Sequence, residues 1–176
     1  MITPVRTCLL LLAAFPALAM LACGYALVDE SSVFGPDVRQ IRLEMFQNET
    51  HEPGLERMLA DAIYEEFLRG GTLEPTWNGG GAPLQMSGVI RSVEVKASAF
   101  DSVGLSLENQ VELVIDVTVA RLPDGESVWS TAGIREVERF SASADPNVHE
   151  TAKQRALRRL SSIVATRIRD ELFQTY

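Results

Sequence analysis

The chain has 176 residues, carries a formal net charge of −8 and is 46% hydrophobic. This length suits one ordinary domain, and the apolar content is enough for a buried core, which argues against a disordered tail. The acidic charge argues against binding to nucleic acid, because proteins that bind nucleic acid present a basic face to the phosphate backbone.

The N-terminal segment has the layout of a secretory signal peptide. Arg6 is its only charged residue, and an almost wholly apolar run over residues 7–21 follows, broken by Pro16. This run is shorter than the roughly 20 apolar residues that a permanent membrane span needs. It leads into Met20-Leu21-Ala22-Cys23, which resembles the lipobox of bacterial lipoproteins, with Met where Leu is usual. We therefore expect residues 1–22 to be a lipoprotein signal peptide.

Cys23 is the expected lipidation site. No cysteine follows it, so a disulfide within the folded part is excluded. The alternative is a plain signal peptide followed by an incidental cysteine. Several acyl chains on one residue anchor a domain stably, whereas a single chain binds a bilayer only marginally. Gly24 follows the cysteine, and by resemblance to enteric sorting rules a residue other than Asp favours the outer membrane. Residues 23–36 would then be a lipidated tether, and residues 37–176 a single domain.

The first strand is expected at residues 38–46. Ile41, Leu43 and Met45 alternate there with polar residues, which is the period of a half-buried strand. A helix is expected next, with Pro53 in its first turn and Gly70-Gly71 at its end. Its apolar residues recur at spacings of three and four, as an amphipathic helix requires; they are Leu55, Met58, Leu59, Ala62, Ile63 and Phe67.

Three strands are expected after a Gly-rich and Pro-rich loop. The first covers residues 84–100 and changes its phase of alternation near Gly88, which predicts a β-bulge there. The second, residues 110–122, alternates most regularly. A turn at residues 123–126, marked by Asp-Gly, leads to a return strand over residues 127–140.

The last element is an amphipathic helix from about Val148. Its apolar stripe comprises Ala156, Leu157, Leu160, Ile163, Val164, Ile168 and Leu172. The expected order is therefore strand-helix-strand-strand-strand-helix. Two amphipathic helices and half-buried strands must cover one another. The sequence thus predicts an α+β fold in which both helices pack on one face of a four-stranded sheet and the other face is partly wet.

The sequence contains few groups that could perform chemistry. His51 and His149 are far apart in the sequence and both are expected to be exposed, so they do not form a metal site. Glu65 and Glu66 point about 100° apart on a helix and are expected on its solvated face. Glu136 and Glu138 invite an acid–base interpretation, and the basic group Lys153, Arg155, Arg158 and Arg159 is expected to be the polar face of the last helix. We expect no enzyme activity, no cofactor and no metal.

Several stretches in order resemble the family of LPS-assembly lipoproteins, the LptE-like proteins of the outer membrane. They are "CGYAL" after the lipobox, "FQNETHEPGLE" before the first helix, "EEFLRGG" at its end, "NQVELVIDVTVARLPDGESVW" and the helix after "DPN". The resemblance spans essentially the whole mature chain.

The resemblance implies a non-enzymatic protein on the periplasmic side of the outer membrane. Such proteins sit partly in the lumen of the LPS translocon barrel, LptD, as plug and assembly partner, and support lipopolysaccharide transport to the cell surface. Better-known members are thought to contact LPS phosphates through basic residues near loop tips. The matching tip here, residues 100–109, has no Lys or Arg; Lys96, Arg135 and Arg139 lie nearby in the sequence. No LPS-contact residue is therefore assigned. The alternative is another adaptor lipoprotein, either a cell-wall synthase activator or a secretin pilotin.

Overall fold

The structure is a computed structural model that describes residues 34–35, 37–77 and 80–174. The expected signal peptide, Cys23 and nearly all of the expected tether lie outside these residues. The elements, in chain order, are β1 (Gln40–Leu43), β2 (Gln47–Asn48), α2 (Leu55–Gly70), β3 (Glu74–Thr76), β4 (Leu84–Phe100), β5 (Ser106–Arg121), β6 (Glu126–Ser141) and α3 (Pro146–Gln174).

The sheet has six strands in the order β3-β1-β4-β5-β6, with β2 also paired to β4. The three long strands form an antiparallel meander, in which β5 and β6 make the expected hairpin, whereas β1, β2 and β3 pair in parallel with their neighbours. The expectation of four strands was wrong in two places. The first expected strand is split into β1 and β2, and the loop after α2 contributes β3. Both additions are two or three residues long, which is too short for a periodic pattern to be recognised.

The split between β1 and β2 reverses the side chains at Met45 and Phe46. Met45 was expected to be buried but is 49% exposed, and Phe46 is buried in its place. The ring of Phe46 lies over Gly88 on β4: a Cβ added to Gly88 would come within 2.3 Å of Phe46 Cε1 and 2.5 Å of the Asp116 carbonyl oxygen. Gly88 is therefore required for this close approach, and it is not a bulge.

Two of the register shifts of the long strands lie on one line across the sheet. The pairing of β4 with β5 shifts between Ile90 and Ser92, not at Gly88. The pairing of β6 with β5 shifts opposite Ile115 and Val117. Both shifts fall on the same short stretch of β5, so the sheet bends there as one unit.

The two helices begin and end close to the expected positions. The first hydrogen bond of α2 joins Met58 N to the carbonyl of Gly54, so Pro53 lies before the helix rather than in its first turn. At the other end, Gly71 is left-handed with φ of 71°. Helix α3 starts at Pro146, two residues earlier than expected, because Asp145 caps it: the Asp145 carboxylate accepts the N–H of Asn147 at 2.8 Å.

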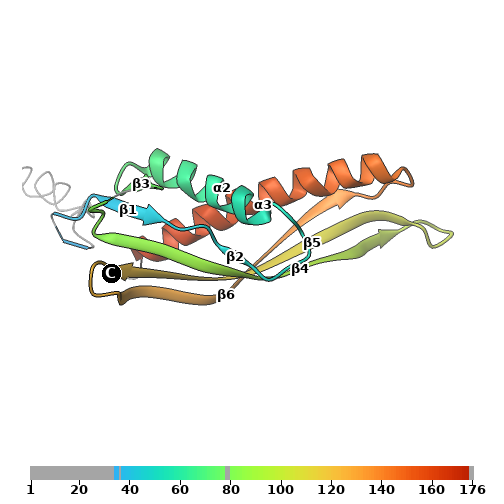
Figure 1. Ribbon diagram of the computed structural model, residues 1–176. Helices are drawn as coiled ribbons and strands as arrows, with labels where there is room; N and C mark the ends of the chain where they lie inside the picture. Colours follow the sequence, from blue (N-terminus) through green and yellow to red (C-terminus); the bar gives the residue numbers. More distant parts are fainter. Residues whose placement is uncertain (1–33, 36, 78–79, 175–176) are drawn as a thin grey trace, which may run out of the picture.

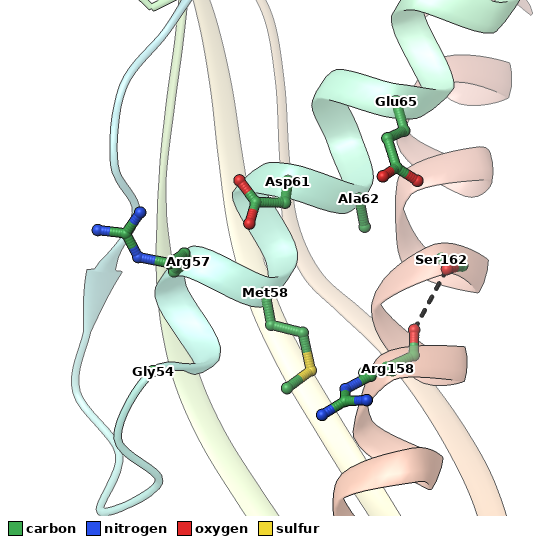
Figure 2. Close-up of a pocket in the computed structure, with 8 residues that line it drawn as sticks. All are labelled: Gly54, Arg57, Met58, Asp61, Ala62, Glu65, Arg158 and Ser162. Atoms are coloured by element: carbon green, nitrogen blue, oxygen red, sulfur yellow. Dashed lines mark hydrogen bonds between the residues drawn. The ribbon is translucent and has the colours of Figure 1, made fainter.

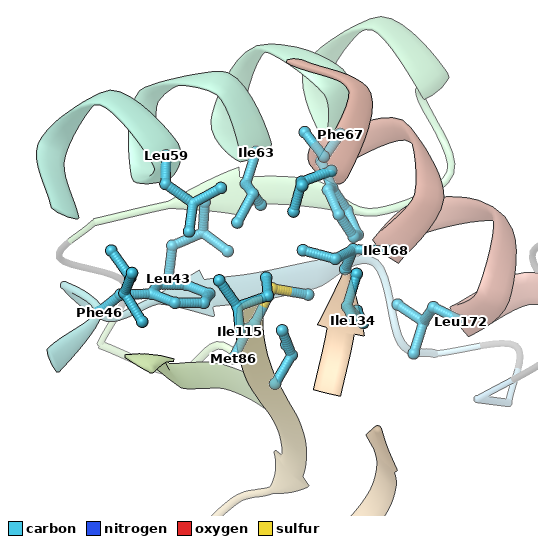
Figure 3. Close-up of a cluster of buried hydrophobic side chains, with 14 of the residues drawn as sticks. Leu43, Phe46, Leu59, Ile63, Phe67, Met86, Ile115, Ile134, Ile168 and Leu172 are labelled. Carbon is cyan, nitrogen blue, oxygen red and sulfur yellow. The ribbon is translucent and has the colours of Figure 1, made fainter. Parts of the chain in front are cut away.

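Both helices cover the same face of the sheet, as predicted (Figure 1), and the fold class is α+β. Side chains from both helices and from the strands meet in one apolar core (Figure 3). Burying each large apolar side chain contributes about 1.5–3 kcal/mol. Ile163 is an exception to the predicted stripe of α3, since it is 41% exposed, and Ser161 and Ala165 are buried instead. Among the labelled core residues are Leu59, Ile63, Phe67, Met86, Ile115, Ile168 and Leu172.

The described N-terminal end and the β4–β5 turn lie at opposite ends of the molecule (Figure 1). Arg121, the last residue of β5, donates a hydrogen bond to the carbonyl of Phe34 at 3.2 Å. Phe34 also packs edge-on against Phe173 near the end of α3, with ring centroids 6.4 Å apart. Strand β5 has 16 residues, and a rise of about 3.4 Å per residue gives it a length of roughly 50 Å.

Candidate interaction surfaces

A groove runs between the outer sides of α2 and α3 (Figure 2). Met58 and Ala62 are partly buried apolar side chains in this groove. Asp61 and Glu65 stand one turn apart on α2. The groove therefore combines an apolar patch with charged side chains of both signs. This combination suits contact with another molecule, and the lining includes no nucleophile activated by a base. Its lining is Gly54, Arg57, Met58, Asp61, Ala62, Glu65, Arg158 and Ser162.

A polar recess lies around the line of bulges. Asp116 accepts hydrogen bonds from Gly133 N at 2.8 Å and from Arg91 Nε at 2.7 Å. Arg91 also donates to Glu49 at 3.0 Å. The Gly133 N–H, followed by the Arg91 guanidinium, holds the pKa of Asp116 below its ordinary value. These contacts occupy the carboxylate and join β5 to both neighbouring strands, so its role is structural.

Glu66 was expected on a solvated helix face, but it is buried. Its carboxylate contacts Arg69 on the same helix and Arg169 on α3, the latter at 2.6 Å. The neighbouring Glu65 is exposed, as expected. Glu66 therefore links the two helices and is not available for acid–base chemistry.

The carboxylates of β6 and several basic side chains of α3 also form structural pairs. Glu136 pairs with Arg167 and Glu138 with Arg159, each at 2.6 Å. The same two arginines donate to the carbonyls of Arg135 and Arg139 on β6. These bonds fix α3 along the strand. Of the remaining basic group, Lys153 binds Glu52 at 2.9 Å, while Arg155 and Arg158 are exposed.

The two histidines do not meet in a site. His51 is exposed, as expected, but His149 is half-buried, with its ring edge-on to Phe140 at 5.4 Å. Across the described part of the chain, no group of three or more possible metal ligands occurs. Nor does any described helix have the length and apolar character to cross a membrane.

The β4–β5 turn exposes a cluster of large apolar side chains, which the sequence analysis missed. Phe100 is 61% exposed, Val103 78%, Leu105 66% and Leu107 57%. The signal in the sequence was four large apolar residues within eight positions, where a hairpin turn is normally polar. We call residues 100–107 the apolar turn.

The basic residues nearest to the apolar turn each contact a carboxylate on the same sheet. Lys96 lies 2.6 Å from Glu94, and Arg135 lies 2.5 Å from Glu112. Arg139 is 3.6 Å from Glu108. These basic side chains are therefore already engaged by carboxylates of the sheet.

The fold and these surfaces define a small α+β domain that offers places for contact with other molecules. The chain matches the family model of the lipopolysaccharide-assembly protein LptE over residues 38–172, and it therefore belongs to the LptE family. Members of this family are non-enzymatic, envelope-associated lipoproteins, and membership supports a general role in LPS assembly. No curated protein sequence matches the chain.

Solved structures of a lipoprotein, a putative lipoprotein and a hypothetical protein are similar to the chain in fold. The rare lipoprotein B from Shewanella oneidensis matches with a TM-score of 0.52 and 15% identity, over 78% of this chain and 96% of that one. A putative lipoprotein from Caulobacter crescentus matches with a TM-score of 0.50 and 12% identity, over 74% and 88% of the two chains. A hypothetical protein from Chlamydia trachomatis gives 0.50 and 11%, over 76% and 97%. At these identities the likeness concerns the fold alone.

Proposed function

We propose that this protein is an outer-membrane lipoprotein, anchored through Cys23, that plugs the LPS translocon barrel and assists its assembly. It would thereby support the transport of lipopolysaccharide to the cell surface. The observation that carries the proposal is the family match, which extends from β1 through most of α3.

The character of the exposed surfaces supports a place inside a wide barrel. Large outer-membrane barrels have polar lumens, and some are plugged by a separate structure. The recess on the sheet is lined mainly by polar and charged side chains, including Arg91 and Asp116. The groove between the helices also has a charged edge. Both surfaces can therefore contact the polar wall of a lumen in place of water, and the core stays buried.

The dimensions of the domain are compatible with the same role. The long hairpins extend for roughly 50 Å, comparable to a bilayer of about 40–45 Å including its headgroup regions. A lipid anchor on Cys23, which precedes the described residues in the sequence, would hold the domain beside the membrane. Tethering two partners to one membrane raises their effective concentration, so barrel and lipoprotein can associate even if free association is weak.

Depletion of the protein tests its role in assembly. We expect the LPS translocon barrel, of about 26 strands as in the larger known barrels, to remain unfolded or wrongly oxidised when the lipoprotein is absent. Folding is measured as the change in the gel mobility of the unheated barrel, and oxidation as the mobility without reductant. Re-expression of the natural chain should restore both, and a Cys23→Ser chain should restore them poorly. Normal maturation of the barrel in depleted cells would contradict the proposed role in barrel assembly.

A further inference from the structure

The apolar turn is an ordered feature and not a loose loop. The Asp101 carboxylate accepts the backbone N–H groups of Val103 and Leu105, both at 2.9 Å. Asp101 N donates to the carbonyl of Leu105 at 2.9 Å, and Gly104 N donates to the carbonyl of Asp101 at 3.1 Å. Gly104 has the left-handed φ of 83° that this tight turn needs. The large apolar side chains are thus held outward by the fold.

From this geometry we infer that the apolar turn inserts into the acyl-chain region of a phospholipid bilayer with zwitterionic headgroups. The four large apolar side chains are exposed to water in the free protein. The transfer of each one from water into the acyl-chain region stabilises the inserted state. The turn lies at the end of the molecule opposite the described N-terminal end (Figure 1). In the protein that has not yet entered a barrel, it would therefore be a second point of membrane contact, separate from the lipid anchor.

The internal hydrogen bonds of the turn favour a lipid environment in particular. A backbone N–H or C=O that enters the acyl region without a partner costs several kcal/mol. Here the N–H groups of Asp101, Val103, Gly104 and Leu105 are all used within the turn. Asp101 carries the one charge between Phe100 and Leu107, and its carboxylate serves two of those bonds. The turn can therefore leave water with few unpaired polar groups.

The charges behind the turn favour zwitterionic headgroups over strongly anionic ones. Lys96, Gln110 and Arg139 lie in one row across β4, β5 and β6. This row is four residues from Phe100, or about 13 Å along the strand, within reach of headgroups for long basic side chains. Glu94 and Glu108 accompany the two basic residues. The row thus presents both signs of charge, as phosphatidylethanolamine and phosphatidylcholine do.

Protection of a cysteine in the turn tests the inference without a barrel. The full chain carrying Val103→Cys is placed in phosphatidylethanolamine–phosphatidylcholine vesicles, and the rate of its reaction with a charged maleimide is measured. The matched control is Asp124→Cys, in the exposed polar turn between β5 and β6. Each rate is divided by the rate of the same chain unfolded in urea, and the unsubstituted chain gives the background from its natural cysteines.

We expect Val103→Cys to react about ten-fold more slowly than Asp124→Cys, since burying one large apolar side chain shifts an equilibrium by at least that factor. Adding Leu105→Asp and Leu107→Asp should abolish the protection while leaving the circular dichroism unchanged, because both side chains are exposed. Equal rates for the two single variants would overturn the inference. So would protection that survives the two Asp substitutions, or protection that needs added LPS or a barrel. Failure here leaves the proposed function intact, because no barrel is present.

Discussion

Glu66 is a residue whose partners decide its role. A glutamate beside a second glutamate on an amphipathic helix is expected in solvent, yet it is buried against two arginines. The sequence shows Arg69 one turn away on the same helix, but it cannot show Arg169, which comes from α3. Burial of this carboxylate is therefore a tertiary property. Its neighbour Glu65 is also a glutamate of α2, but it remains exposed.

Removing the charge of Glu66 tests whether the buried Glu66 contributes more to stability than the exposed Glu65. We expect Glu66→Gln to lower the free energy of unfolding by about 1–3 kcal/mol, because it loses charge-assisted hydrogen bonds in a site shielded from water. Glu65→Gln is the matched control and should change stability by less than about 0.5 kcal/mol. Urea unfolding followed by circular dichroism measures both. Equal effects of the two substitutions would mean that the interhelical pairs contribute nothing.

Gly88 shows a second limit of reading residues from the sequence. Its place in a strand correctly indicated a special position, since glycine in a strand marks either a bulge or a close approach. The choice between these depended on Phe46, more than forty positions away, whose ring fills the space a Cβ would need. The bulge was instead at Arg91, a residue that no local pattern distinguishes.

At the scale of elements, long periodic segments were predicted well and short ones were missed. Helix α2, the long strands and the face that the helices cover follow from periodicities of 3.6 and 2 residues, each sustained over several turns or pairs. Strands β2 and β3 have no such length. They exist because β4 and β1 offer unpaired backbone groups beside them. The exposure of the apolar turn was not predicted either, because the exposure of an apolar side chain depends on what packs over it, which one segment of sequence does not show.

The line of bulges predicts how stability depends on pH. The pKa of Asp116 is lowered in the folded state, so its contribution is present above the unfolded pKa of about 3.9 and is lost as the pH falls through the lower folded value. Asp116→Asn should therefore reduce the free energy of unfolding at pH 7 and weaken its fall between about pH 5 and pH 2. Thermal unfolding across this range measures the effect.

Asp124→Asn removes the same charge at an exposed turn and is the control for Asp116→Asn. Among the described residues its carboxylate has no ion pair, so we expect its unfolding curve at pH 7 to match that of the natural chain. A natural chain whose acid sensitivity equals that of Asp116→Asn would contradict the role given to the bonds from Gly133 and Arg91.

At the scale of the whole molecule, the sequence indicated the family and the fold class but not the surfaces. A core can be predicted from hydrophobic spacing alone, because burial is non-directional. A groove, a recess or an exposed turn depends on which segments meet, and this is set by topology. The proposed function rests on family membership together with these surfaces, while the anchor at Cys23 lies outside the described residues.

The identity of the partner tests the account most directly. The full chain, carrying a C-terminal tag, is purified from detergent-solubilised outer membranes, and the proteins bound to it are identified by mass spectrometry. We expect the large LPS translocon barrel to be recovered in a fixed ratio to the lipoprotein. Recovery of a cell-wall synthase or a secretin in place of that barrel would contradict it.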